Sequence, residues 1–174
     1  MSLRNARVRS VGAQIDRMAA LWPSFRSRRL GEEARWRGTL RPLQQFYLIE
    51  VQFAPQDLDR PMVRLVDPPL TPRTGSSFED IPHLIFDASR HHLSGMCLFD
   101  PNGDSWRPTM WIADTTMLWA AKWLYFYELW HFDGVWRGGG VGPATIAEAR
   151  TAAVHGSSSE RTKDPKEEVA VARG

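Results

Sequence analysis

The sequence predicts an α+β domain in which a helix precedes a four-stranded antiparallel meander and a long aromatic helix packs on the sheet. Three patterns support this order. Apolar residues recur at helical spacing between Val11 and Phe25, alternate with polar ones between Arg35 and Phe53, and return to helical spacing from Ile112 to Phe132. Short connections between the strands favour antiparallel pairing.

Length and composition indicate a single globular domain. The 174 residues can enclose a sizeable core, and the 43% hydrophobic and 24% charged residues are typical of soluble proteins. We expect residues 1–155 to form this domain and residues 156–174 to be a disordered, polar tail. A lone cysteine favours the reducing cytoplasm, and the N-terminus lacks the apolar core of a signal peptide.

The first helix is predicted from a stripe of apolar residues, and Pro23 should distort or end it. Four strands are then expected at 35–41, 46–53, 62–66 and 84–86, because their residues alternate or form short apolar runs between turn signals. Pro68-Pro69 keeps the third from continuing as a central strand. A further short helix is expected at 144–154. The stripe of the first helix comprises Val11, Ile15, Met18, Trp22 and Phe25.

The segment from Ile112 to Phe132 is apolar nearly all round, which raises the possibility of a membrane span. Four ionisable residues interrupt it, so we expect a helix buried against the sheet instead. Gly134 and the Gly138–Gly140 run should end it. Its stripe comprises Ile112, Thr116, Trp119, Trp123, Phe126 and Trp130, and the interrupting residues are Asp114, Lys122, Glu128 and His131.

Positive charge is concentrated near the N-terminus, where residues 1–41 hold ten arginines and three acidic residues. A solvated basic helix face explains this better than a nucleic-acid-binding surface, because no nucleic-acid-binding motif accompanies the arginines. We therefore expect the N-terminal helix to present a docking surface for an acidic partner and expect no nucleic acid or membrane among the partners.

Cys97 is the candidate nucleophile, because it lies between a glycine-containing turn and a Pro/Asn/Gly loop, where a thiol is accessible. His91 or His92 would lower its pKa or accept a proton from an incoming amine. Asp100 would orient a lysine or accept its proton. The competing interpretations are a buried cysteine, exposed histidines and an Asp100 that caps its own turn.

No cofactor or metal ion is expected. Asp100, Asn102 and Asp104 mimic the start of a calcium loop, but Ser105 replaces the required glycine and Trp111 the required glutamate. The glycine run follows a helix and not a strand, so it does not fit a dinucleotide fingerprint. The spacing of the histidines and Cys97 matches no standard structural zinc site. Trp106 and Trp136 are expected to be packing residues.

Several motifs between Gly95 and Gly140 resemble the ubiquitin-conjugating enzyme family, in which a glycine precedes a catalytic Cys-Leu pair and a Trp-x-Pro follows. The resemblance is closest to the prokaryotic branch of anti-phage defence operons, including type II cyclic-oligonucleotide-based signalling systems (CBASS). The matching motifs are Cys97-Leu98-Phe99-Asp100-Pro101, Trp106-Arg107-Pro108, Ile112-Ala113-Asp114-Thr115, Trp123-Leu124-Tyr125-Phe126-Tyr127-Glu128-Leu129-Trp130 and Gly134-Val135-Trp136-Arg137-Gly138-Gly139-Gly140.

This resemblance implies a ubiquitin-conjugating-like fold and a thioester on Cys97. The donor would be the C-terminal tail of a cGAS/DncV-like nucleotidyltransferase, delivered directly or by a separate activating enzyme. Two alternatives remain: an inert module that binds the nucleotidyltransferase, and a small cysteine hydrolase. The family's His-Pro-Asn tripeptide is absent, with Ser89–His92 in its neighbourhood, and Val141-Gly142-Pro143 replaces the His-Pro of the prokaryotic branch. The group that supports the oxyanion is therefore not identified.

Overall fold

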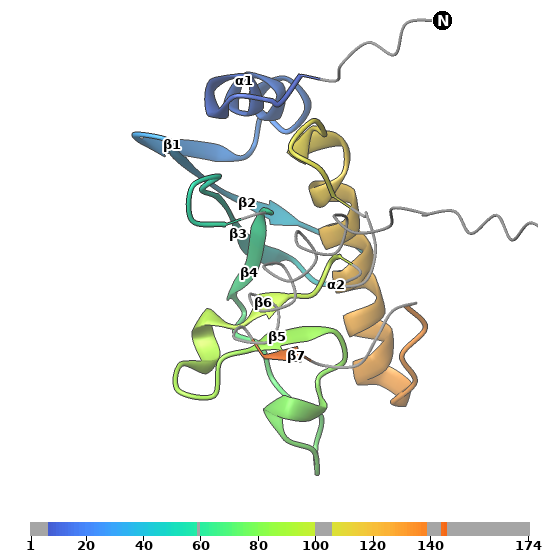
Figure 1. The fold of residues 1–174 in the computed structure, drawn as a ribbon. Coiled ribbons are helices and arrows are strands. Elements are labelled where there is room, and N and C mark those ends of the chain that lie inside the picture. The colour runs from blue at the N-terminus through green and yellow to red at the C-terminus, as the bar shows by residue number, and fades with distance from the viewer. Residues whose placement is uncertain (1–6, 59, 100–105, 139–143, 146–174) are drawn as a thin grey trace, which may run out of the picture.

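The computed structural model describes residues 7–58, 60–99, 106–138 and 144–145. Within them, a short helix stands at one end of a four-stranded sheet, and a long helix runs along the sheet (Figure 1). The predicted boundary at 155 and the predicted tail fall outside the described residues, so both stay predictions.

The first helix, α1, spans Val11–Leu21 and begins at Ser10, whose hydroxyl accepts the N–H of Ala13. Serine is favoured at this position because its side chain satisfies one of the unpaired N–H groups of the first turn. The helix ends at Leu21, two residues before Pro23, so Phe25 lies beyond it. Phe25 is nevertheless buried, because its ring lies against Gly38 of the sheet.

The main sheet is an antiparallel meander of β1 (Arg26–Leu30), β2 (Glu33–Leu40), β3 (Tyr47–Phe53) and β4 (Met62–Asp67). The four-stranded meander is thus confirmed, but its membership differs from the prediction. β1 had no apolar alternation to reveal it, since all five of its residues are exposed. Its ladder with β2 and a tight turn at Gly31, with φ of 59°, hold it in place.

The strand predicted at 84–86 belongs to a second, small sheet. There β5 (Leu84–Phe86) pairs antiparallel with β6 (Gly95–Met96) and parallel with β7 (Ala144–Thr145). The helix predicted to start at 144 is wrong for the two residues described, because they form β7. Two short 3₁₀ helices, η1 (Phe78–Asp80) and η2 (His91–Leu93), flank this sheet.

The aromatic helix is confirmed as η3 (Ile112–Asp114) followed by α2 (Thr116–Asp133), which packs on the main sheet. Gly134 ends α2 with φ of 81°, a conformation that glycine adopts without strain. The buried face is rotated slightly from the predicted stripe: Ala120 and Tyr127 are buried, whereas Trp119 and Phe126 are half-buried. No helix among the described residues is long and apolar enough to cross a membrane.

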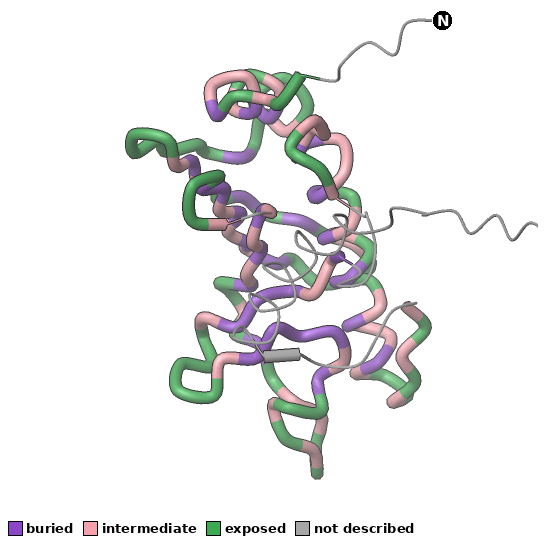
Figure 2. The backbone as a smooth tube through the Cα atoms, in the orientation of Figure 1, coloured by how far each residue is buried: buried purple, intermediate pink, exposed green. Residues whose placement is uncertain are grey.

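The core lies between the sheet and α2, where the buried stretches of chain face one another (Figure 2). β3 alternates between buried and half-buried residues along its whole length, as a strand with one face on the core must. Tyr47 and Tyr127 join the two layers, with ring centroids 6.4 Å apart.

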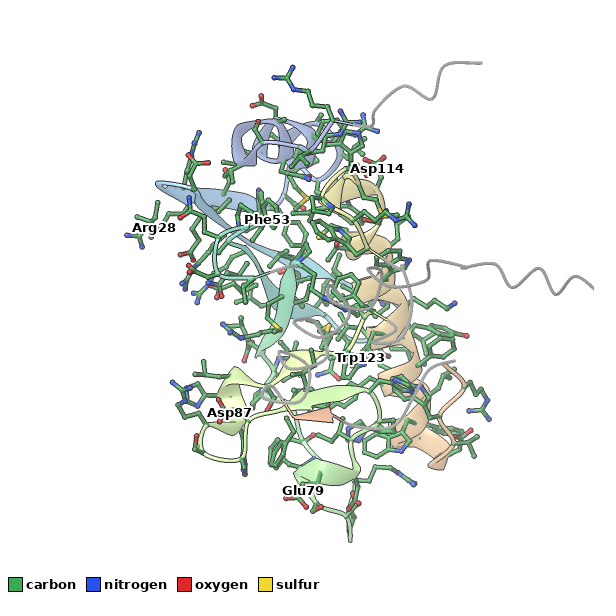
Figure 3. All side chains as sticks on the ribbon, in the orientation of Figure 1. Arg28, Phe53, Glu79, Asp87, Asp114 and Trp123 are labelled. Carbon is green, nitrogen blue, oxygen red and sulfur yellow. The ribbon has the colours of Figure 1, made fainter. Side chains whose placement is uncertain are left out.

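The prediction that the arginine excess lies on the N-terminal helix is wrong. Of the ten arginines in residues 1–41, only Arg17 belongs to α1, and it is bound to Asp114. Three lie on β1 and two on β2. Figure 3 shows the side chain of Arg28, in the middle of β1, pointing away from the body of the molecule. The sheet, and not the helix, therefore carries the basic surface.

Candidate active site around Cys97

The β5–β6 hairpin positions Cys97. Leu84 pairs with Met96 and Ile85 with Gly95, so Cys97 is the first residue after β6. β6 lies directly against β4, and a side chain at Gly95 would collide with the sulfur of Met62. The glycine of the Gly-Met-Cys sequence thus leaves room for the Met62 side chain between β4 and β6.

The carbonyl oxygen of His83 joins Cys97 to the long helix. It accepts the main-chain N–H of Cys97 at 2.8 Å and the indole Nε1–H of Trp123 at 2.8 Å. Because Trp123 is buried in the middle of α2, this shared acceptor fixes the start of the cysteine loop relative to the core.

His83 itself is an unusual residue. Its φ of 53° is in the left-handed region, which non-glycine residues rarely adopt. Its ring is buried and stacks on Trp136, with centroids 5.3 Å apart. Burial lowers the pKa of His83, which keeps the imidazole neutral at neutral pH. The main chain of His83 contacts Cys97, while its imidazole packs on Trp136.

Cys97 is half-buried, and it lies on an irregular segment between the strands and the aromatic helix, as predicted. Its thiol donates to the carbonyl oxygen of Phe99, with sulfur and oxygen 3.6 Å apart. Phe99 is buried and packs edge-on against Trp119 of α2, with ring centroids 5.5 Å apart. The loop is therefore anchored on both sides of Cys97, and the cysteine itself stays half-buried.

The two histidines named from the sequence lie at the opposite end of the hairpin. His91 and His92 form η2 and are exposed. The ring of His91 packs between Phe78 and Phe86, at centroid distances of 4.6 and 5.1 Å. The hairpin register therefore brings His83, and neither His91 nor His92, to the main chain of Cys97.

His91 and His92 instead line a groove of about 690 Å³ beside the main sheet. Arg37, Arg64 and Arg90 share this lining. The loop that carries the histidines is shaped by Asp87, whose carboxylate accepts from Ser89 and from the N–H of Arg90. The hydrogen bond from Ser89 is the main reason that the pKa of Asp87 lies below its usual value. Asp100 lies outside the described residues.

The family described as Type II CBASS E2 protein matches residues 14–143, well over half of the chain. The chain belongs to this family. It is a CBASS E2 protein of anti-phage defence. No curated protein matches the sequence.

In this CBASS E2 protein, the segment between the cysteine loop and α2 is held by α1. The buried side chain of Gln14 donates to the carbonyl of Met110 and accepts the N–H of Ile112. Trp22 donates to the carbonyl of Ala113. Helix α1 thus serves as a brace for η3. Trp106, at the start of the same segment, packs on Phe53, in agreement with the packing role predicted for it.

Sequence reasoning did not place His83 beside Cys97, because fourteen positions of chain separate the two residues. A signal was nonetheless present. His83 directly precedes an apolar strand, and Cys97 directly follows the strand that pairs with it. Within the described residues, no three His, Cys, Asp or Glu side chains converge in a way that could hold a metal ion.

Proposed function

We propose that Cys97 carries an acyl group as a thioester and transfers it to an amine. The observation that best supports this is the position of Cys97 within the region that matches the E2 family. It is half-buried and directly follows the β5–β6 hairpin. A polypeptide tail and an amine must both reach the sulfur, and a cysteine in the core would admit neither.

The chemistry needs two substitutions at one carbonyl carbon. In the first, the Cys97 thiolate attacks the activated acyl group, a carbon–sulfur bond forms, and the previous carrier leaves with its electron pair. In the second, an amine attacks the same carbon and the carbon–sulfur bond breaks. Cys97 then leaves as a thiolate, and the proton of the amine passes to a nearby base or to water.

Four side chains are candidates for handling that proton. His91, His92 and Asp100 follow from the sequence, and we add His83 because its main chain is bonded to Cys97. A His83→Asn variant tests the addition, since asparagine tolerates the left-handed backbone while removing the imidazole. We expect slower amine transfer from the charged thioester while thioester formation persists. If the transfer rate is unchanged, His83 does not accept the proton of the amine, and His91, His92 and Asp100 remain the candidates.

The proposed donor is the C-terminal tail of a cGAS/DncV-like nucleotidyltransferase of the same operon. Conjugating that tail to an amine would prime the nucleotidyltransferase during phage infection. The acyl group must arrive already activated, because a carboxylate is a poor electrophile. A separate activating enzyme, or the partner itself in a reactive form, would supply it.

Two alternatives make different demands on the site. A cysteine hydrolase needs a histidine within hydrogen-bonding reach of the sulfur, with an acid behind it. Among the described residues, the thiol bonds to the Phe99 carbonyl and no histidine does so. An inert binding module would need no reactive thiol at all, so it is distinguished by experiment.

The test is intact-mass spectrometry after co-expression with the neighbouring operon proteins. We expect an adduct on the wild-type protein that a thiol reagent removes. The adduct should be absent from Cys97→Ala, and Cys97→Ser should hold a longer-lived ester because oxygen is the poorer leaving group. Cys97→Ala should melt like the wild type. If no adduct forms and Cys97→Ala keeps full anti-phage protection, the binding-module alternative replaces the proposal.

A further inference from the structure

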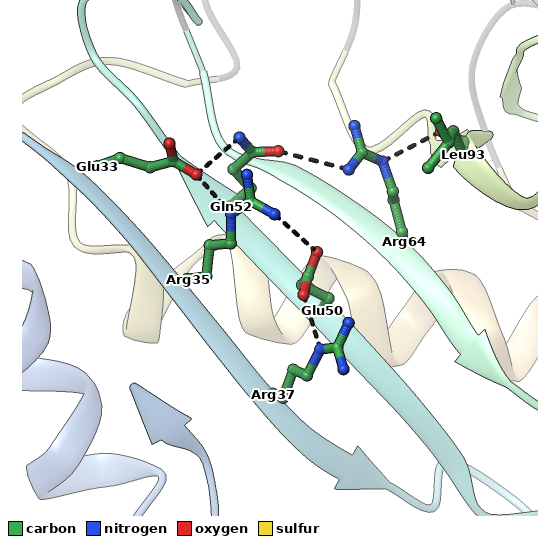
Figure 4. A network of polar contacts seen from close by, with 7 residues as sticks. All are labelled: Glu33, Arg35, Arg37, Glu50, Gln52, Arg64 and Leu93. Atoms are coloured by element: carbon green, nitrogen blue, oxygen red, sulfur yellow. Dashed lines mark hydrogen bonds and ion pairs between the residues drawn. The ribbon is translucent and has the colours of Figure 1, made fainter. Parts of the chain in front are cut away.

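The face of the main sheet turned away from α2 carries a concentrated set of arginines, which we call the arginine face. In Figure 4, polar side chains of β2, β3 and β4 stand on this face with the long helix behind the sheet. β1 extends the face, because residues paired across an antiparallel ladder project to the same side. The arginine face comprises Arg26, Arg28, Arg35, Arg37 and Arg64, with Glu33 and Glu50 as its acidic members.

Two pairs of arginines stand directly opposite each other. Arg26 pairs in register with Arg37, and Arg28 with Arg35. Side chains in such positions are only about 4.5–5.5 Å apart at Cβ, and like charges there are destabilising. Opposed like charges lower the stability of the sheet, so we expect them where the charges bind a partner.

The glutamates form ion pairs with the arginines of β2. Glu50 binds Arg37 at 2.7 Å and approaches Arg35 at 3.9 Å, and Glu33 also binds Arg35. By contrast, neither Arg26 nor Arg28 has an acidic partner among the described residues, and both are exposed. The arginine face therefore keeps its uncompensated positive charge on β1.

β1 also offers an open backbone edge. It is the outermost strand of the sheet, and within the described chain no strand pairs with its far side. All five residues are exposed, and the contact to α1 is made by the side chain of Arg29, which lies near Gly12. Unpaired N–H and C=O groups on an edge strand are a template for another strand.

We propose that β1 binds an acidic, extended polypeptide segment as an added strand of the main sheet. Main-chain hydrogen bonds to β1 would give affinity. Acidic side chains at alternate positions would project to the arginine face and reach Arg26 and Arg28. The proposal does not depend on thioester chemistry at Cys97.

The geometry favours this ligand over two others. A second copy of β1 would bring arginines against arginines, which is the arrangement that edge strands use to avoid self-pairing. Nucleic acid would exploit the charge but leave the open backbone edge unused. An acidic strand satisfies both features.

The test uses a short fluorescein-labelled peptide in which glutamate and threonine alternate, with binding followed by anisotropy. The Arg26→Glu/Arg28→Glu variant should bind it more weakly by roughly tenfold or more. Arg7→Glu/Arg41→Glu makes the same change in net charge at exposed arginines outside the arginine face, and it should bind like the wild type. The Cys97→Ala variant should also be unaffected. Equal losses in the two double variants, or no binding by the wild type, would overturn the proposal.

Strand addition is tested with two N-methylated forms of the peptide, one modified at every glutamate and one at every threonine. Only alternate N–H groups of an added strand face β1, so one form should lose binding and the other should keep it. Equal binding by both forms would rule out strand addition. A single-stranded oligonucleotide that binds more tightly than the peptide, through Arg26 and Arg28, would show that the surface serves nucleic acid instead.

Discussion

The main-chain N–H of Cys97 donates to the carbonyl oxygen of His83, and the indole of Trp123 donates to the same oxygen. A single acceptor thus links the cysteine loop, the residue before β5 and the middle of α2. These two hydrogen bonds fix the main chain at Cys97. The burial of Met96 and Phe99, which precede and follow it, restrains the loop further. Substitutions in the buried face of α2 should therefore change the position and reactivity of Cys97.

Replacing Trp123 tests that link. The side chain is buried, packs on Tyr127 with ring centroids 5.2 Å apart, and donates to His83. Trp123→Ala should lower the free energy of unfolding by about 3–5 kcal/mol in denaturant melts. It should also speed alkylation of Cys97, because the carbonyl of His83 loses one of its two donors. The control is Phe132→Ala on the same helix, where a ring that is 88% exposed should contribute little. A loss below about 1 kcal/mol for Trp123→Ala would contradict the burial on which the argument rests.

Gly95 provides a second route to the same loop. A methyl group there would overlap the sulfur of Met62, so β6 must move or Met62 must turn away. We expect Gly95→Ala to cost about 1–3 kcal/mol of stability, as overpacking usually does. Adding Met62→Ala should restore part of that loss by opening space. If the double variant is less stable than the sum of the two single variants predicts, the contact with Met62 is not the cause.

The sequence predicted most of the fold because apolar and polar residues alternate with the period of the element wherever a strand or helix has one face on the core. β2, β3 and β4 alternate as expected, and the aromatic residues of α2 could only be buried together. β1 escaped prediction because neither of its faces is buried. Nothing in Arg26–Leu30 distinguishes a strand held by its neighbour from a polar loop.

The site was predicted less completely than the fold. Cys97 was recognisable from its own surroundings in the chain, since a lone cysteine followed by Leu98, a turn and Trp106 is a local pattern. The contact between Cys97 and His83 was not recognisable from the sequence, because the pairing of β5 with β6 depends on where the hairpin turns. The turn lies at η2 and carries His91 and His92 away from Cys97, leaving His83 beside it.

The ion pair between Arg17 and Asp114 predicts a pH dependence of stability. Two hydrogen bonds of 2.7 and 2.8 Å join α1 to η3, and the hydrogen bond from Arg17 holds the pKa of Asp114 below its ordinary value. A depressed carboxyl pKa stabilises the fold above the unfolded-state pKa, and this contribution is lost as the pH falls through the folded-state pKa. Asp114→Asn should therefore melt below the wild type at neutral pH, and the difference should shrink in acid. Asp16→Asn, an exposed change on α1, should show no such convergence. A melting difference that stays constant down to strongly acidic pH would exclude the ion pair as its source.

Reversing one charge on β1 separates the stability of the sheet from its proposed binding role. Arg26 faces Arg37 across the ladder, so Arg26→Glu replaces a repulsion with an attraction. We expect the free energy of unfolding to rise by about 0.2–1 kcal/mol, measured by denaturant titration at low salt. The gain should shrink when salt screens the charges. Arg29→Glu is the matched control, because Arg29 lies on the same strand but bonds Glu32 at 3.0 Å, and its reversal should lower stability instead. Opposite signs for the two variants, together with weaker peptide binding by the Arg26→Glu/Arg28→Glu variant, would mean that β1 gives up stability to present its arginines. A loss of stability in Arg26→Glu would show that the opposed arginines are not in conflict, and the charge argument for the arginine face would fail.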